Sequence, residues 1–256
     1  MSEAAPRKPR PSRSKAAKAA AAAEAQKRVR GPLWRQALRW AGRGLLGLAG
    51  FYLLLIVLYA FVNPPGNLYM WSESRRLGGV SQISVNIEDS APAMARSVVA
   101  AEDANFCLHW GFDMAAIRAA VEAGSNRGAS TLSQQVVKNV FLWHGRSWLR
   151  KAMEAVITPV VELVWSKQRI LEVYLNVAEF DVGVFGVQAA AQHYFGVDAK
   201  DLSPQQAARL AAVLPDPKGR SAGKPSSFVR SRARQIASGA QTIEADGRAG
   251  CFEPAN

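Results

Sequence analysis

Three carboxylates have the residue type and the setting that proton transfer requires. Glu102 and Asp103 close the apolar run at residues 98–101, and Glu154 ends the short motif RKAME. A glutamate held against apolar neighbours has a raised pKa, so it can act as a general acid or base near neutral pH. Paired carboxylates that flank a sugar are the usual apparatus for breaking or making glycosidic bonds. The pattern points to acid–base chemistry, although a solvated helix end shows the same residue types.

Basic residues around one predicted helix suit a phosphate or a pyrophosphate. Thr131 is the second residue of the segment STLSQQVVKNVFLW and marks a helix start, which offers free backbone N–H groups and the positive end of the helix dipole. Lys138 lies two turns further along, and the other candidate cations are Arg146, Arg150 and Lys151. Taken alone this signal is weak, because basic residues near a helix end usually form a solvated face.

Charge and hydropathy divide the chain into three parts. Lys and Arg outnumber Asp and Glu by 32 to 20, and twelve basic but only two acidic residues precede Gly44. The apolar run at 44–62 is as long as one bilayer crossing, and no small-x-small cleavage site ends it. The positive-inside rule places the tail at 1–43 in the cytoplasm and the domain at 63–256 on the other side. This topology favours anionic lipid over nucleic acid as the tail's partner.

Apolar residues at helical spacing predict that the domain at 63–256 is mainly α. Residues 150–176 continue the helical period, with Pro159 kinking or bracketing the helix, and residues 80–87 alternate as a short β segment would. One helix is predicted to begin at Ser90, with Pro92 in its first turn, and another to run from Asp113 to Gly124. Two further helix starts are predicted by capping boxes, one formed by Thr131 and Gln134 and the other by Ser203 and Gln206.

The two cysteines and three histidines give little indication of a metal or of a disulfide framework. Cys107 and Cys251 are too few for a disulfide scaffold, and their pairing stays open because sequence does not place them in space. A semi-buried thiol at each position is the favoured expectation. None of His109, His144 and His193 has the spacing of zinc ligands, so a zinc site is improbable.

Three motifs follow one another along the chain, EDANFCLHWGFD, GASTLSQQVVKN and RKAME. They look like the ED-x-x-F-x-x-H-x-G-x-D, G-G-S-T-x-x-Q-Q-x-x-K-N and R-K-x-x-E motifs of one enzyme family, the peptidoglycan glycosyltransferases of glycosyltransferase family 51. SKQRILEVYLN and GVFGVQAAAQHYFG are similar to the next two blocks, so the match runs in order from Ile83 to Pro217. The run YLNVAEFDVGVFGVQAAAQHYFG and the expected absence of a second domain point to the monofunctional members of Gram-negative bacteria.

The resemblance implies a mainly α fold, with a lysozyme-like head lobe and a smaller membrane-facing lobe after one N-terminal transmembrane helix. It implies a periplasmic domain, anchored in the inner membrane by a single pass, that polymerises lipid II into β-1,4 glycan strands and releases undecaprenyl pyrophosphate. Lipid II, the growing strand and inner-membrane lipids are the expected partners, with other cell-wall synthesis or division proteins as further candidates. No cofactor is certain, and the metal is unknown, with a divalent cation such as Mg²⁺ or Mn²⁺ as the candidate.

The family's motifs also carry roles onto positions of this chain. Glu102 corresponds to the catalytic base that deprotonates the acceptor 4-hydroxyl, and Glu154 to the second carboxylate, near the donor phosphate. Lys138 and Arg146 correspond to the pyrophosphate-binding residues. The other substrate-binding positions implied are Gln134, Gln135, Ser130, Thr131, Asp103, His109, Arg150 and Lys151. Within the first motif, Asp103, Phe106, His109 and Gly111 are expected to shape the loop around Glu102.

The chain departs from the family pattern at two positions, and one segment has two interpretations. Ala129 replaces the second glycine of G-G-S-T, and Met153 stands where some relatives have a lysine. The aromatic-rich segment from Phe141 to Leu149 is explained equally by a lobe resting in the membrane interface and by a packed core.

Three rival functions stay open at this point. A lytic muramidase also uses a lysozyme-like head with one crucial glutamate, but the cations and the anchor favour synthesis. A bifunctional penicillin-binding protein is disfavoured because the S-x-x-K match at residues 12–15 lies in the tail, with no K-[ST]-G after it. A membrane-anchored scaffold without activity is disfavoured because Glu102, Glu154 and Lys138 are all present.

Overall fold

The computed structural model describes residues 13–29, 33–122, 124, 130–145 and 147–253. The chain separates into two compact units, Met1–Leu53 and Leu54–Asn256. The first unit holds α1 (Arg13–Val29), whose alanines have the highest helix propensity, and most of α2 (Leu33–Tyr59). α2 is long and apolar enough to cross a membrane. Residues 44–59 of the predicted apolar span form the C-terminal part of this longer helix, and residues 60–62 lie beyond its end.

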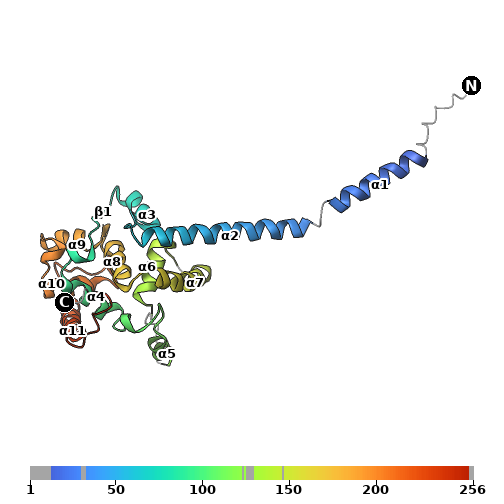
Figure 1. Ribbon diagram of the computed structural model, residues 1–256. Helices are drawn as coiled ribbons and strands as arrows, with labels where there is room; N and C mark the ends of the chain where they lie inside the picture. Colours follow the sequence, from blue (N-terminus) through green and yellow to red (C-terminus); the bar gives the residue numbers. More distant parts are fainter. Residues whose placement is uncertain (1–12, 30–32, 123, 125–129, 146, 254–256) are drawn as a thin grey trace, which may run out of the picture. The chain divides into compact units, whose positions relative to one another are not determined.

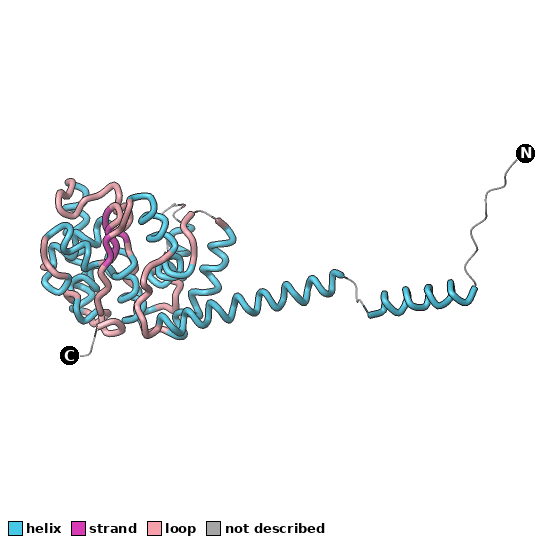
Figure 2. Tube along the Cα trace, turned by 90° about the horizontal axis from the view of Figure 1, so that it is seen from above, coloured by secondary structure: helices cyan, strands magenta, loops and turns pink. Residues whose placement is uncertain are grey.

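The second unit is mainly α, as the sequence predicts (Figure 1). Its helices are α3 (Leu68–Leu77), α4 (Pro92–Glu102), α5 (Met114–Glu122), α6 (Leu132–Phe141), α7 (Trp148–Val164), α8 (Lys167–Val177), α9 (Val187–Phe195), α10 (Pro204–Val213) and α11 (Ser227–Ala245), with short 3-10 turns at Ile87–Asp89, Phe106–Leu108 and Ala199–Asp201. Figure 2 shows one small sheet among these helices. Its strands are β1 (Ser81–Gln82), β2 (Glu179–Asp181) and β3 (Val184–Phe185), with β3 in the middle, parallel to β1 and antiparallel to β2.

Two groups of packed helices position the site. α4 packs against α10 and α11, while α6 packs against α7 and α8. Met94 and Val98 on α4 are fully buried, as are Leu132 and Val136 on α6. These pairs are spaced by four residues, so they lie on one face of each helix and bury it against its neighbours. A hydrogen bond from Gln135 on α6 to Glu102 joins the end of α4 to the second group.

Local sequence signals place the helix starts well. Thr131 and Ser203 each form the predicted capping box, and the carboxylate of Asp113 accepts from the N–H of Ala116 in the first turn of α5. α4 begins at Pro92 with Ala91 as its N-cap, one residue later than a Ser90 cap would give. The helix of residues 148–164 continues through Pro159.

The predicted β segment at 80–87 is mostly not a strand. Only Ser81 and Gln82 pair with β3. Further along, the N–H and C=O of Val85 bond to the side-chain amide of Asn176, at 2.9 and 2.8 Å. A buried side chain on α8 thus replaces a neighbouring strand as the partner of this backbone.

The expectation of two free thiols is wrong, because Cys107 and Cys251 form a disulfide. The chain returns after α11 to the loop that follows α4, which brings together residues 144 positions apart. No periodicity in the sequence reports such a long-range approach.

The aromatic segment from Phe141 to Leu149 divides between the two interpretations. Phe141 and Leu142 are buried, with Phe141 against the rings of Tyr59 and Trp165. Trp148 and Leu149, in contrast, are 92% and 64% exposed. The first part therefore belongs to the core and the last part to the surface.

Candidate active site

Glu102 is the last residue of α4, and its carboxylate faces α6. The side-chain amide of Gln135 donates a hydrogen bond of 2.9 Å to Glu102 Oε2. Burial raises the pKa of Glu102 above its ordinary value, while the hydrogen bond from Gln135 and the charges of Arg232 and Lys138 act in the opposite direction. Burial therefore makes Glu102 a stronger base than a glutamate in water, because it disfavours the charged form.

The loop after Glu102 is held against α6 by Asp103. One carboxylate oxygen of Asp103 accepts from the N–H of Leu132 at 2.9 Å, and the other lies 2.9 Å from the ring of His109. The hydroxyl of Thr131 donates to the carbonyl of Gly111 at 2.7 Å. Gly111 has φ +83°, and a Cβ there would lie 2.6 Å from Thr158, so only glycine fits this turn. These contacts fix where α4 ends relative to α6.

The same contacts correct one expectation about the start of α6. The N–H groups of Thr131, Leu132 and Gln134 donate to side chains of Gln134, Asp103 and Thr131, respectively. They are therefore not free to bind an anion, as the helix start alone suggested. The helix end serves to anchor the loop, because Asp103 and the capping box supply its acceptors.

Glu154 is the shared acceptor of a cluster of polar and charged side chains, and its charge also acts on Lys138. Glu154 is only 2% exposed, and its carboxylate accepts from Arg150 at 2.8 Å, from Gln134 at 3.3 Å and from Lys151. Burial lowers the pKa of Lys138, and the charge of Glu154 opposes this. The two cations balance the charge of Glu154, and the amide of Gln134 adds a hydrogen bond. These partners explain how a carboxylate is tolerated in a buried position.

The donor set around Glu154 does not fit a divalent cation. Both of its oxygens already accept from nitrogen donors, three of them in all. Within the described parts of the chain, no group of three or more His, Cys, Asp or Glu side chains could hold a metal ion. Arg146, the other predicted pyrophosphate contact, lies outside the described residues, as does Ala129.

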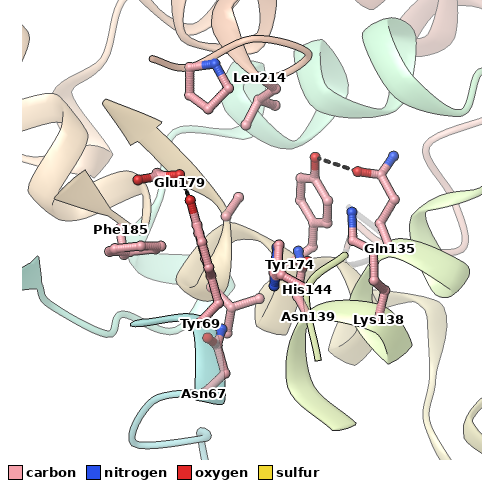
Figure 3. Close-up of a pocket in the computed structure, with 13 residues that line it drawn as sticks. Asn67, Tyr69, Gln135, Lys138, Asn139, His144, Tyr174, Glu179, Phe185 and Leu214 are labelled. Atoms are coloured by element: carbon pink, nitrogen blue, oxygen red, sulfur yellow. Dashed lines mark hydrogen bonds between the residues drawn. The ribbon is translucent and has the colours of Figure 1, made fainter. Parts of the chain in front are cut away.

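Two cavities meet at Gln135. The larger, about 710 Å³, is lined by Glu102, Ser130 and Gln135, and on its other wall by Arg220, Phe228 and Arg232. The smaller, about 180 Å³, is lined by Gln135, Lys138, Tyr174, Tyr69, His144 and Glu179, among others (Figure 3). Because Gln135 lines both, the base candidate and the cation candidate open onto neighbouring cavities.

Figure 3 shows that the smaller cavity includes side chains that the sequence did not single out. Tyr69, at the start of α3, stacks on His144 with ring centroids 3.8 Å apart and donates to Glu179 at 2.8 Å. Burial and the nearby charge of Lys138 lower the pKa of His144 to about 4, so its ring is neutral at physiological pH. The segment that follows the apolar helix thus forms one wall of the site.

Tyr174 supports the contact between Gln135 and Glu102. Its hydroxyl lies 3.4 Å from Gln135 Oε1, at the long end of hydrogen-bonding distance, and burial raises its pKa well above the ordinary value. The neutral hydroxyl can donate to the amide oxygen, which leaves the amide nitrogen facing Glu102. The sequence placed Tyr174 only within the helical period at 150–176, and nothing in the sequence indicated Arg232.

The predicted site residues therefore fall into three neighbouring sets. Glu102, Ser130, Gln135 and Lys138 line the cavities. Gln134, Arg150, Lys151 and Glu154 form the charge cluster. Asp103, His109 and Thr131 hold the loop.

Comparisons with known proteins agree along most of the chain. Residues 72–241 match the family model described as Transglycosylase. The biosynthetic peptidoglycan transglycosylase of Jannaschia sp. (strain CCS1) is 62% identical over 224 residues, 87% of this chain and 94% of that protein. Those of Pseudomonas putida (strain GB-1) and Stutzerimonas stutzeri (strain A1501) are 50% and 52% identical, covering 78% and 75% of this chain and 89% and 84% of theirs.

Proposed function

The chain belongs to the peptidoglycan transglycosylase family, and we propose that Glu102 is the general base with which it polymerises lipid II. Its activity is peptidoglycan glycosyl transfer, which builds glycan strands for the cell wall, and its fold is the mainly α, lysozyme-like class that the resemblance implied. The observation that carries the proposal is the position of Gln135, which lines both cavities and donates to Glu102.

The base acts on the acceptor sugar. Glu102 removes the proton of the 4-hydroxyl of the acceptor GlcNAc as that oxygen attacks the anomeric carbon of the donor. The new bond is β-1,4, formed with inversion as the bond from the anomeric carbon to pyrophosphate breaks. The amide of Gln135 orients the carboxylate at 2.9 Å, and partial burial keeps it basic enough to accept the proton.

Cations stabilise the leaving group. Negative charge builds up on undecaprenyl pyrophosphate as it departs, and Lys138, on the wall of the smaller cavity, offers an ammonium to it. Arg146 has the same proposed role. Glu154 forms ion pairs with Arg150 and Lys151. Because its negative charge offsets the repulsion among the cations, Arg150 and Lys151 can stay near Lys138.

We propose that the catalytic domain lies in the periplasm and rests against the inner membrane. The basic tail before α2 favours a cytoplasmic N-terminus. The disulfide of Cys107 and Cys251 supports the same orientation, because disulfides persist in oxidising compartments and are rare in the cytosol.

An exposed apolar stripe on α7 supports contact with lipid. Leu149, Val156 and Leu163 recur every seven residues, so they share one helix face, and they are 64%, 71% and 74% exposed. At the end of α7, the indole of Trp165 donates to the carbonyl of Ile56, near the end of the apolar helix. A surface of this kind beside a membrane anchor suits the bilayer interface, where the lipid substrate is found.

Incubation of the full-length protein with fluorescent lipid II tests the proposal. The wild type should produce glycan strands and release undecaprenyl pyrophosphate, with or without a chelator. Glu102→Gln should lower the rate by about 10²- to 10⁴-fold, the usual contribution of a general base, with an unchanged melting temperature. The exposed Glu122→Gln, on α5, is the matched control and should retain full activity.

Three outcomes contradict the proposal. Near-normal polymerisation by Glu102→Gln would remove the glutamate from the mechanism. Cleavage of preformed strands instead of synthesis would support the lytic alternative. Lost activity in the presence of a chelator would show that a metal takes part, contrary to the donor set around Glu154.

A further inference from the structure

The residues after α11 run back to the last turns of α4 and to the loop that follows Glu102. We call Arg248, Cys251, Phe252 and Glu253 the C-terminal clamp. Cys251 is bonded to Cys107, and Arg248 Nη1 donates to the carbonyl of Ala104 at 3.1 Å. Phe252 packs against Phe106, and Glu253 pairs with Arg96 through two hydrogen bonds of 2.7 and 3.0 Å. All four contacts reach residues between 96 and 107, on both sides of Glu102.

The clamp acts on the part of the chain that determines where Glu102 lies. Glu102 ends α4, so its direction depends on how the helix passes into the loop. Asp103 ties that loop to α6, and the clamp ties it to the C-terminal end of the chain. Phe106, at the centre of the loop, is fully buried, and its ring faces the ammonium of Lys167 at 4.5 Å as well as Phe252.

The disulfide distinguishes the clamp from ordinary terminal packing. The chain has two cysteines, and their bond joins segments 144 residues apart. Chain ends fray readily unless they are tied down. A covalent bond keeps Phe252 against Phe106 when the ion pair of Glu253, whose side chain is 20% exposed, opens to water.

We propose that the bond between Cys107 and Cys251 is a positioning element for catalysis, which holds the loop so that Glu102 stays against Gln135. This inference rests on the proposed role of Glu102 as the base. Misplacement of a reacting group by about 1 Å can cost about 10²-fold in rate, so a loosened loop should affect turnover more than substrate binding. Substrate contacts on α6, such as Lys138, do not depend on the clamp.

The test compares the disulfide-bonded protein with its reduced form and with the double variant Cys107→Ser/Cys251→Ser. Dithiothreitol supplies two electrons and two protons, which convert the disulfide into two thiols while the reagent closes to its own cyclic disulfide. At a temperature well below melting, kcat with lipid II should fall by about tenfold and KM should change by less than twofold. The acidic limb of the pH profile of kcat/KM should move to lower pH, because burial is what raises the pKa of Glu102.

The pH profile separates a positioning role from a purely structural one. A lower melting temperature with unchanged kcat and an unchanged acidic limb would mean that the disulfide contributes only to stability, and would overturn the proposal. The double variant must be insensitive to dithiothreitol, which controls for other effects of the reagent. If it does not fold, Phe252→Leu keeps the disulfide and loosens only the contact with Phe106; the same shift of the limb is expected, and its absence refutes the proposal.

Failure of this inference is distinguishable from failure of the proposed function. If Glu102 is not the base, Glu102→Gln remains active whatever the state of the disulfide. If only the clamp proposal is wrong, Glu102→Gln is inactive, whereas the double cysteine variant keeps the kcat and the pH profile of the wild type.

Discussion

Replacement of Gln135 by leucine tests how the structure sets the proton affinity of Glu102. The glutamine side chain donates one hydrogen bond, of 2.9 Å, to the carboxylate, and the leucine side chain, which is one heavy atom shorter, has no donor. This bond favours the charged form, whereas burial favours the neutral form. Leucine removes the donor but keeps the burial, so the pKa of Glu102 must rise.

The size of the shift follows from the hydrogen bond. A bond to a charged group contributes roughly 1.5–3 kcal/mol. Since one pKa unit corresponds to about 1.4 kcal/mol, Gln135→Leu should raise the pKa of Glu102 by about 1–2 units. A base works only when deprotonated, so the acidic limb of kcat/KM should move to higher pH by the same amount. Activity should therefore be lost mainly at low pH and be partly recovered at high pH.

The assay is polymerisation of fluorescent lipid II between pH 5 and 9, at substrate concentrations well below KM. Gln205→Leu, an exposed glutamine on α10, is the control and should leave the limb in place. An unchanged acidic limb in Gln135→Leu, with the protein folded, would refute the reasoning that this limb reports Glu102. A limb moved to lower pH would mean that the substitution admits water to the carboxylate.

Two further predictions concern stability and the membrane surface. Thr131→Ala removes the N-cap of α6 and the hydrogen bond to the carbonyl of Gly111. The free energy of unfolding in detergent, measured by denaturant titration, should fall by about 1–2 kcal/mol. No change would mean that the cap adds nothing to the stability of the fold. A fluorescent dye attached to the cysteine of Trp148→Cys should be quenched by brominated lipids in proteoliposomes. The same dye on Lys200→Cys, an exposed control position, should not be quenched. Equal quenching at both positions would contradict a lipid-facing α7.

Local signals in the sequence were sufficient for most helices and for the family. Thr131 and Gln134 are three residues apart, and Asp113 caps a helix that starts at the next residue, so neighbours in the chain supply the bonds that define these ends. Met94 and Val98 are four residues apart in the helix predicted from Ser90, and both are buried. The motif around Glu102 identified the family because its residues are close in the sequence.

Signals of the same kind misjudged features that depend on distant partners. The start of α6 has the residues of an anion site, but Asp103, which is 29 positions away, takes the N–H of Leu132. The alternating segment at 80–87 has the pattern of a strand, but Asn176 satisfies the backbone of Val85. In both cases a side chain that is distant in the sequence forms a hydrogen bond with a backbone group that has no partner in the local pattern.

The sequence by itself determined the long apolar helix, the helical class and the candidate base, because periodicity, charge and short motifs involve residues a few positions apart. Only the tertiary structure decided that Gln135 faces Glu102, that Tyr69 forms a wall of the smaller cavity, and that Cys107 is bonded to Cys251. These contacts arise when helices pack their apolar faces together, and the free energy of that packing depends on residues from the whole domain. Residues with no shared local pattern are therefore brought within bonding distance.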